Sequence, residues 1–175
     1  ARSIAINSPQ PVLVVKQAAR EGRENMRVLL ASDGSDCSNV TADLLTSLPF
    51  PRETELMVLN VSWSAFSDIP ERFSLEINDR IKEDVARAKT LEYEGAQRTL
   101  EQTKTHISKR FTDIREMIRI GEPAEEILRE AETFQADIIA VGCRGLKGLK
   151  GMLGSVSRRI LGHARCPVFI GKVCE

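Results

Sequence analysis

Two kinds of hydrophobic pattern alternate along most of the chain. Short, nearly continuous apolar runs are typical of strands buried on both faces, and apolar residues three or four positions apart are typical of amphipathic helices. Runs of the first kind predict strands at 27–31, 55–61, 113–120, 136–141 and 168–172. Stretches of the second kind predict helices at 38–48, 75–108, 123–131 and 155–164. Residues 62–74 have no steady period, so we expect a loop there.

This alternation of strand and helix predicts an α/β fold. Parallel strands need a crossover connection, and the helix in each crossover covers one face of the sheet. We therefore expect a three-layer sandwich with a five-stranded parallel sheet of the Rossmann-like type. In such sheets ligands bind outside the carboxyl ends of the strands, where the strand order reverses. The segments after the first and fourth predicted strands should both open onto this crevice.

Residues 1–25 are predicted to be an N-terminal extension of a domain at 26–175. Within the extension, residues 8–16 (SPQPVLVVK) resemble residues 164–172 (ARCPVFIGK). One interpretation is two ordinary strands that each follow a proline. The other makes residues 11–16 a sixth strand, either the end of a preceding domain of the same type or an arm that pairs with a sheet edge. Residues 17–25 would then be a linker.

The last predicted strand would leave an apolar edge exposed at 168–170, and such edges are normally covered. We therefore expect residues 11–16 to pair with that edge, within the chain or across a dimer.

Composition excludes several classes of protein. The 175 residues carry 25 Lys plus Arg and 25 Asp plus Glu, so no excess of positive charge exists to bind a nucleic-acid backbone. No apolar run approaches the roughly 20 residues that span a bilayer, so no membrane partner is expected. The four cysteines lie far apart without a CxxC pair, which argues against a disulfide framework and a zinc site. A reducing cytoplasmic location is the simplest expectation.

The segment 142–157 (GCRGLKGLKGMLGSVS) carries the clearest chemical signal. Closely spaced glycines after a strand let backbone amides approach a phosphate, and a helix N-terminus adds N–H groups with partial positive charge. The segment also carries cations and hydroxyl groups: Arg144, Lys147, Lys150, Ser155 and Ser157. The alternative is a set of glycine turns without a ligand. The cations and the helix start at Gly154 favour a phosphate site.

A second polar segment, residues 31–38 (ASDGSDCS), follows the first predicted strand. Asp33 stands directly at the strand end, where an acidic residue accepts hydrogen bonds from ribose in other nucleotide-binding folds. The alternative is that Asp33, Ser35 or Asp36 only caps the next helix, as Asp and Ser routinely do. We interpret Asp33 as a ligand residue, and Asp36 and Ser38 as capping residues.

Residues 26–172 resemble the universal stress protein family in a series of segments. These are VLLASDGS and VLNVSW at the first two strands, GEPAEEIL before the third helix, ADIIAVGCRG at the fourth strand, and GSVSRRIL before PVFIGK. The resemblance implies an adenine nucleotide alpha hydrolase-like fold and a stress-response protein that binds ATP, AMP or ADP. It implies Mg²⁺ or Mn²⁺ held through the phosphates. It also implies a homodimer or tandem-domain pair joined through the last strand, and a protein partner that the sequence does not identify.

The resemblance also assigns the nucleotide to particular positions. Ala31 and Ser32 would line the base pocket, while Asp33 and the backbone of Val61 would hold the ribose and adenine side. The remaining residues would hold the ribose and phosphates: Gly142, Arg144, Gly145, Gly154, Ser155, Val156 and Ser157. The protein would then act as a nucleotide-dependent switch or interaction module.

No nucleophile and base are paired in the sequence. His106 and His163 lie on predicted helices away from the strand ends, and Cys143 is expected to be an inert loop thiol. We therefore assign no catalytic residue and expect at most slow ATP hydrolysis, driven by phosphate positioning and a metal ion.

The glycine motif departs from the family pattern at one point. The pattern places nine residues between its second and third glycines, whereas eight separate Gly145 from Gly154. The shorter loop leaves a second interpretation open, a dimerisation module of the same family that binds no nucleotide. A third is an enzyme of the ATP-pyrophosphatase type, because residues 32–37 (SDGSDC) distantly resemble its SGGxDS phosphate loop. In that loop Asp33 would repel phosphate.

Gly145→Val should abolish binding of ATP with Mg²⁺, because it places a side chain where a phosphate is expected. Titration calorimetry on the unchanged chain should show binding near micromolar, or about −8 kcal/mol. Equal binding by both proteins would contradict the assignment of Gly145 to the phosphate site.

Overall fold

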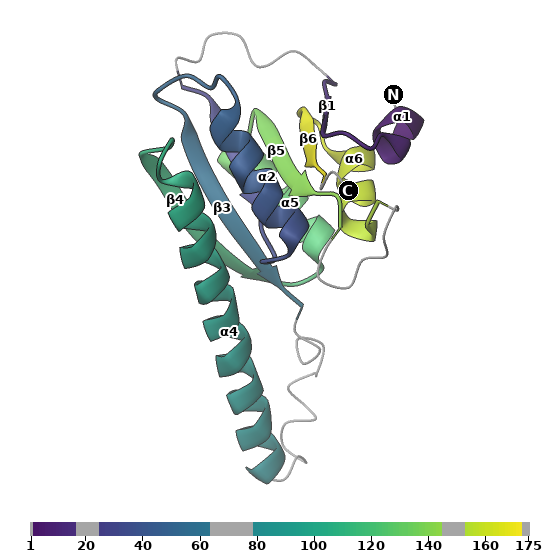
Figure 1. Cartoon of the computed structure of the whole chain (residues 1–175). Helices are drawn as coiled ribbons and strands as arrows, with labels where there is room; N and C mark the ends of the chain where they lie inside the picture. The colour runs from purple at the N-terminus through teal and green to yellow at the C-terminus, as the bar shows by residue number, and fades with distance from the viewer. Residues whose placement is uncertain (1, 17–24, 64–78, 145–152, 173–175) are drawn as a thin grey trace.

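The structure, a computed structural model, describes residues 2–16, 25–63, 79–144 and 153–172. These residues form one sheet with helices on both faces (Figure 1). Several predictions lie outside the described residues: the loop from residue 64 on, the start of the long helix before residue 79, and Gly145, Lys147 and Lys150.

The sheet has six strands in the order β1-β6-β5-β2-β3-β4. They are β1 (Val12–Val14), β2 (Arg27–Ala31), β3 (Glu55–Ser62), β4 (Asp113–Ile120), β5 (Ile138–Gly142) and β6 (Val168–Gly171). All neighbours pair in parallel except β1, which pairs antiparallel with β6. The α/β, Rossmann-like prediction is confirmed, but the sheet has six strands rather than five because the N-terminal segment joins it. The expected pairing of this segment with the final edge occurs within the chain.

The strand order reverses between β2 and β5. From β2 the chain adds β3 and β4 on one side, and then returns to add β5 and β6 on the other. Ala31 lies opposite Val141 in the β2–β5 ladder, so the carboxyl ends of these two strands lie side by side. The segments 32–35 and 142–144 therefore leave the sheet at one point, where open α/β sheets bind their ligands.

Four longer helices cover the sheet: α2 (Asp36–Ser47), α4 (Asp79–Ile107), α5 (Pro123–Phe134) and α6 (Ser155–His163). Under α2 and α4, Leu45 and Ile107 join one core cluster with residues of β2 and β3. On the opposite face, Ile127 and Ile160 from α5 and α6 join a second cluster. Figure 1 shows the two helical layers, and α4 continuing well beyond the sheet. Both faces of the central strands are thus covered, which explains their continuous apolar runs.

The turn between β2 and α2 corrects two predictions. Gly34 has a φ of +76°, a backbone conformation that favours glycine. The N-cap of α2 is Ser35, whose hydroxyl accepts a hydrogen bond from the backbone N–H of Ser38. The assignment of Asp36 and Ser38 as caps was wrong because the helix begins at Asp36, so both residues already lie in its first turn.

The N-terminal segment also contains a short helix, α1 (Arg2–Asn7), which the sequence pattern did not predict. Ala5 of this helix is fully buried in the core cluster on the α6 side of the sheet. Six residues are too few to show a helical period. Within the described residues, no helix is long and apolar enough to cross a membrane.

Gly171→Ala should lower the free energy of unfolding by about 1–3 kcal/mol, because overpacking forces neighbouring atoms apart. Its Cβ would lie 2.0 Å from Oγ1 of Thr41 on α2. Gly95→Ala, inside α4, is the matched control, since nothing lies within 4 Å of its Cβ. It should raise the free energy of unfolding by about 1 kcal/mol through helix propensity. Urea unfolding measures both, and a neutral Gly171→Ala would contradict the close packing of α2 on β6.

Candidate functional site

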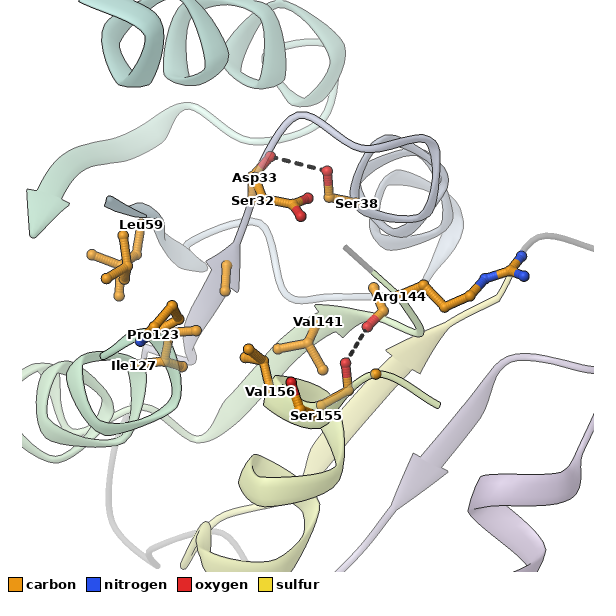
Figure 2. Close-up of a pocket in the computed structure, with 15 residues that line it drawn as sticks. Ser32, Asp33, Ser38, Leu59, Pro123, Ile127, Val141, Arg144, Ser155 and Val156 are labelled. Atoms are coloured by element: carbon orange, nitrogen blue, oxygen red, sulfur yellow. Dashed lines mark hydrogen bonds between the residues drawn. The ribbon is translucent and has the colours of Figure 1, made fainter. Parts of the chain in front are cut away.

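A cavity of about 320 Å³ lies at the point where the strand order reverses. It opens between the ends of β2, β3 and β5 and the first turns of α5 and α6 (Figure 2). Its lining residues are Ala31, Ser32, Asp33, Ser38, Leu59, Val61, Pro123, Ile127, Val141, Gly142, Arg144, Gly154, Ser155, Val156 and Ser157. Such a volume is within the range of small-molecule sites in proteins.

Ser32 forms the buried base of the cavity at the end of β2. Its hydroxyl lies 2.9 Å from that of Thr103 on α4 and 3.4 Å from that of Ser38 on α2. Its backbone N–H donates to the carbonyl of Leu59, and its carbonyl accepts from the side-chain amide of Asn60. These bonds fix the direction in which the chain leaves β2, and with it the position of Asp33.

Asp33 contributes a carboxylate to the cavity and also stabilises its own turn. Its Oδ1 accepts a hydrogen bond of 3.1 Å from the backbone N–H of Ser35. The capping interpretation therefore describes one interaction of Asp33, although Ser35 and not Asp33 is the N-cap of α2. The same carboxylate lines the cavity, where it can accept hydrogen bonds from a ligand hydroxyl.

The β5 side of the cavity packs closely on the start of α2. A Cβ at Gly142 would lie 2.9 Å from the backbone carbon of Cys37, so only glycine fits there without a shift. The Sγ atoms of Cys37 and Cys143 lie 3.1 Å apart, and Cys143 is buried, as an inert loop thiol would be. The hydroxyl of Ser35 donates to the carbonyl of Arg144 at 3.3 Å. The two loops of the cavity are therefore tied to each other.

Arg144 carries a permanent positive charge at the mouth of the cavity. Its hydrogen bond with Cys37 raises the pKa of the guanidinium further, against a smaller opposing effect of burial. Figure 2 shows the side chain pointing away from the apolar end of the cavity. From this position it can approach a charged group at the mouth of the cavity.

The N-terminus of α6 faces the cavity. Gly154, the N-cap, provides no side-chain cap, and within the described residues no hydrogen bond uses the backbone N–H groups of Ser155, Val156 or Ser157. The hydroxyl of Ser157 donates to the carbonyl of Gly142 at 2.6 Å. This bond holds the helix start against β5 and leaves the unused N–H groups, with the positive end of the helix dipole, facing the cavity.

On the opposite side, the backbone of Val61 extends past the end of β2. The carbonyl of Leu59 accepts a hydrogen bond on the β2 side, and the carbonyl of Ser62 accepts one from Gly121 on the opposite side. Because the backbone groups of successive strand residues point to alternate sides, the N–H and C=O of Val61 point toward β2. Because β2 pairs only as far as Ala31 opposite Leu59, these two groups face the cavity instead of a strand. One donor and one acceptor are thus presented side by side.

An apolar wall completes this end of the cavity. Its side chains come from four elements: Leu59, Pro123, Ile127, Val141 and Val156. Figure 2 shows Leu59, Pro123 and Ile127 together, apart from the polar end with Ser155 and Arg144. The cavity therefore has an apolar end beside the Val61 backbone and an anion-compatible end beside α6.

The structure brings the predicted site residues together in this cavity, except Gly145, which lies outside the described residues. Sequence reasoning missed Ser38 as a lining residue, and of the apolar wall it predicted only Val156. Pro123 and Ile127 carried a usable signal, because the first turn of a helix that follows a parallel strand lies at the carboxyl edge of the sheet. Leu59 and Val141 carried none, since any buried strand residue looks alike in the sequence.

A model of the universal stress protein family matches residues 24–172. The curated protein named Universal stress protein YxiE, from Bacillus subtilis, is 32% identical over 154 residues, which cover 82% of this chain and 97% of that protein. Among solved structures, the hypothetical protein MJ0577 has a TM-score of 0.69 at 24% identity, over 84% of this chain and 95% of that one.

Some of the similar structures contain nucleotides. A universal stress protein family protein from Arabidopsis thaliana with AMP bound has a TM-score of 0.59 at 19% identity, over 84% of this chain and 91% of that one. A universal stress protein in complex with cAMP and the Archaeoglobus fulgidus protein in complex with dAMP have TM-scores of 0.58 and 0.59, at 21% and 19% identity. They cover 84% of this chain and 96% and 98% of their own. At these identities the structures show the same fold.

Ser157→Ala should lower the free energy of unfolding by about 1 kcal/mol, because it removes the hydrogen bond to the carbonyl of Gly142. Ser155→Ala is the control on the same turn: its side chain is exposed and makes no hydrogen bond within the described residues. Chemical denaturation should show a change below about 0.5 kcal/mol for the control. An equal loss in both variants would mean that the Ser157 bond does not hold α6 in place.

Proposed function

Because the chain belongs to the universal stress protein family, we propose that its cavity binds an adenine nucleotide. The observation that carries the proposal is the pairing of two unlike ends in one cavity. The N–H groups at the start of α6 suit a phosphate, and the apolar end beside Val61 suits a purine base.

The base would lie at the apolar end. Adenine presents a ring-nitrogen acceptor beside an amino donor, which complements one backbone N–H and one backbone C=O of the same residue. Val61 offers that pair, while Pro123, Ile127 and Val156 offer apolar surface to the ring. Guanine carries a carbonyl acceptor where adenine has its amino donor, so it fits this pair less well.

The sugar and phosphates would continue toward α6. Asp33, which lines the cavity, would accept hydrogen bonds from ribose hydroxyls. The backbone N–H groups of Ser155, Val156 and Ser157 would bind phosphate oxygens, with Arg144 at the mouth for a longer phosphate chain.

ATP is the nucleotide we expect, with AMP and ADP as the alternatives. Within the described residues no group of three His, Cys, Asp or Glu side chains could hold a metal ion. Mg²⁺ or Mn²⁺ would bind mainly through phosphate oxygens, for which the carboxylate of Asp33 is a compatible neighbour. We propose that nucleotide binding acts as a switch for interaction with another protein in a stress response.

One observation favours a second function. The eight residues between Gly145 and Gly154 make the loop one residue shorter than the family pattern. If the loop closes the phosphate end, the chain would be a dimerisation module without a nucleotide.

Titration calorimetry with AMP, ADP, ATP and GMP, with and without Mg²⁺, tests the proposal. The adenine nucleotides should bind, and GMP should bind at least tenfold more weakly. Asp33→Ala should weaken AMP binding at least tenfold, about 1.4 kcal/mol, because it removes the acceptor for the ribose.

Asp36→Ala is the matched control, since Asp36 is an exposed carboxylate three residues away that does not line the cavity. It should bind AMP like the unchanged chain. If no adenine nucleotide produces heat or a thermal shift, the nucleotide proposal fails and the dimerisation module becomes the function to pursue.

A further inference from the structure

Two cysteines from distant parts of the chain meet beside the cavity. Cys37 lies in the first turn of α2, and Cys143 directly follows β5, 106 positions further along the chain. Their Sγ atoms are nevertheless only 3.1 Å apart, and both side chains are buried free thiols. A disulfide bond is about 2.05 Å long, so the two sulfurs need to approach by only about 1 Å to form one.

The backbone holds this pair of thiols together. A Cβ at Gly142 would lie 3.0 Å from the Cβ of Cys37, so the missing side chain of Gly142 lets the next residue, Cys143, reach α2. The N–H of Cys143 donates to the carbonyl of Gly171 at 2.8 Å, and its carbonyl accepts from the N–H of Gly154 at 2.7 Å. Cys143 is thereby fixed to β6 and to the N-cap of α6. The two sulfurs are therefore brought together by packed elements of the fold.

A positive charge lies next to both sulfurs. The guanidinium of Arg144 donates a hydrogen bond to Cys37 and, with a smaller effect, to Cys143. A neighbouring cation and a helix N-terminus both stabilise the thiolate, which is the form of cysteine that reacts with oxidants. Burial makes the thiols inert toward large reagents, which favours a bond within the chain. The sequence neighbours Ser38, Gly142 and Arg144 line the cavity, which brings a molecule as small as hydrogen peroxide close to the pair.

We propose that Cys37 and Cys143 are a site of oxidation by hydrogen peroxide, at which they form a reversible disulfide. One sulfur, as the thiolate, attacks a peroxide oxygen; the O–O bond breaks, hydroxide leaves, and the sulfur becomes a sulfenic acid. The other thiol attacks that sulfur, the S–S bond forms, the S–O bond breaks, and water leaves with the thiol proton. In total, two thiols and one hydrogen peroxide give one disulfide and two water molecules. Thiol–disulfide exchange with a dithiol reverses the reaction.

The disulfide also changes the phosphate end of the cavity, a consequence that rests on the proposed function. In the reduced chain the two thiols are hydrogen-bond partners of Arg144. A disulfide cannot become negatively charged, so it binds a guanidinium more weakly than a thiol or thiolate does. Oxidation therefore weakens the contact that holds Arg144 beside the sulfurs, and its guanidinium can turn to the outer phosphates of ATP. AMP lacks these phosphates, so oxidation favours ATP over AMP.

Peptide mapping of the intact chain by mass spectrometry tests the disulfide without any nucleotide. After treatment with hydrogen peroxide and blocking of the remaining thiols in denaturant, the peptides of Cys37 and Cys143 should be recovered as a linked pair. Dithiothreitol should separate them. Cys166→Ala is the matched control, because it removes a different, partly buried thiol and should leave the linked pair unchanged. Cys37 and Cys143 peptides that stay reduced, or that carry sulfinic acid instead of a link, would overturn the proposal.

Titration calorimetry of the reduced and oxidised chains with ATP and AMP tests the effect on the cavity. Oxidation should lower the dissociation constant for ATP by at least about threefold and change that for AMP by less than about twofold. Cys37→Ala cannot form the bond and should bind both nucleotides equally before and after peroxide treatment. A linked pair with an unchanged ratio of the two constants would overturn the effect on Arg144. If neither form binds a nucleotide, the proposed function fails, whereas a linked pair still supports the disulfide.

Discussion

The parallel pairing of β2 with β5 is the interaction on which the rest of the structure depends. These strands are more than 100 positions apart in the chain, and their ladder ends with Ala31 opposite Val141. The chain leaves both strands at the same point, which lets Ser35 bond to the carbonyl of Arg144. Without this pairing, the acidic turn after β2 and the start of α6 would be separate surface features and would enclose no cavity.

Close backbone packing sets the shape of that cavity. Gly142 and Gly171 let α2 approach the ends of β5 and β6 to a distance at which any larger residue would collide with Cys37 or Thr41. The N-terminal turn of α2 therefore lies against the cavity, which Ser38 of this turn lines. Larger residues at these two glycines are therefore poorly tolerated. The same close packing gives a rigid frame to the few groups that face a ligand.

The edge of the sheet at β6 is subject to a different constraint. A parallel sheet must end in edge strands, and the edge at β6 is apolar. The chain covers this edge with β1, which pairs antiparallel with β6. The reciprocal bonds of Lys16 and Lys172 fix the register of this contact. Helix α6 connects the two regions, since its first turn lines the cavity and the carbonyl just after its last turn accepts a hydrogen bond from Lys16.

The sequence by itself determined the longer helices, the strands and the polar side of the site, because these are encoded locally. Apolar runs gave the bounds of β2 and β4, and glycines, Asp33 and the serines of α6 mark groups that can bind a phosphate and a sugar whatever lies around them. Only the tertiary structure decided that the sixth strand pairs within the chain, that Ser35 is the cap of α2, and that Leu59 and Val141 line the site. These features depend on which strands become neighbours and how far each extends past the next, and such long-range contacts leave no pattern in the residues that make them.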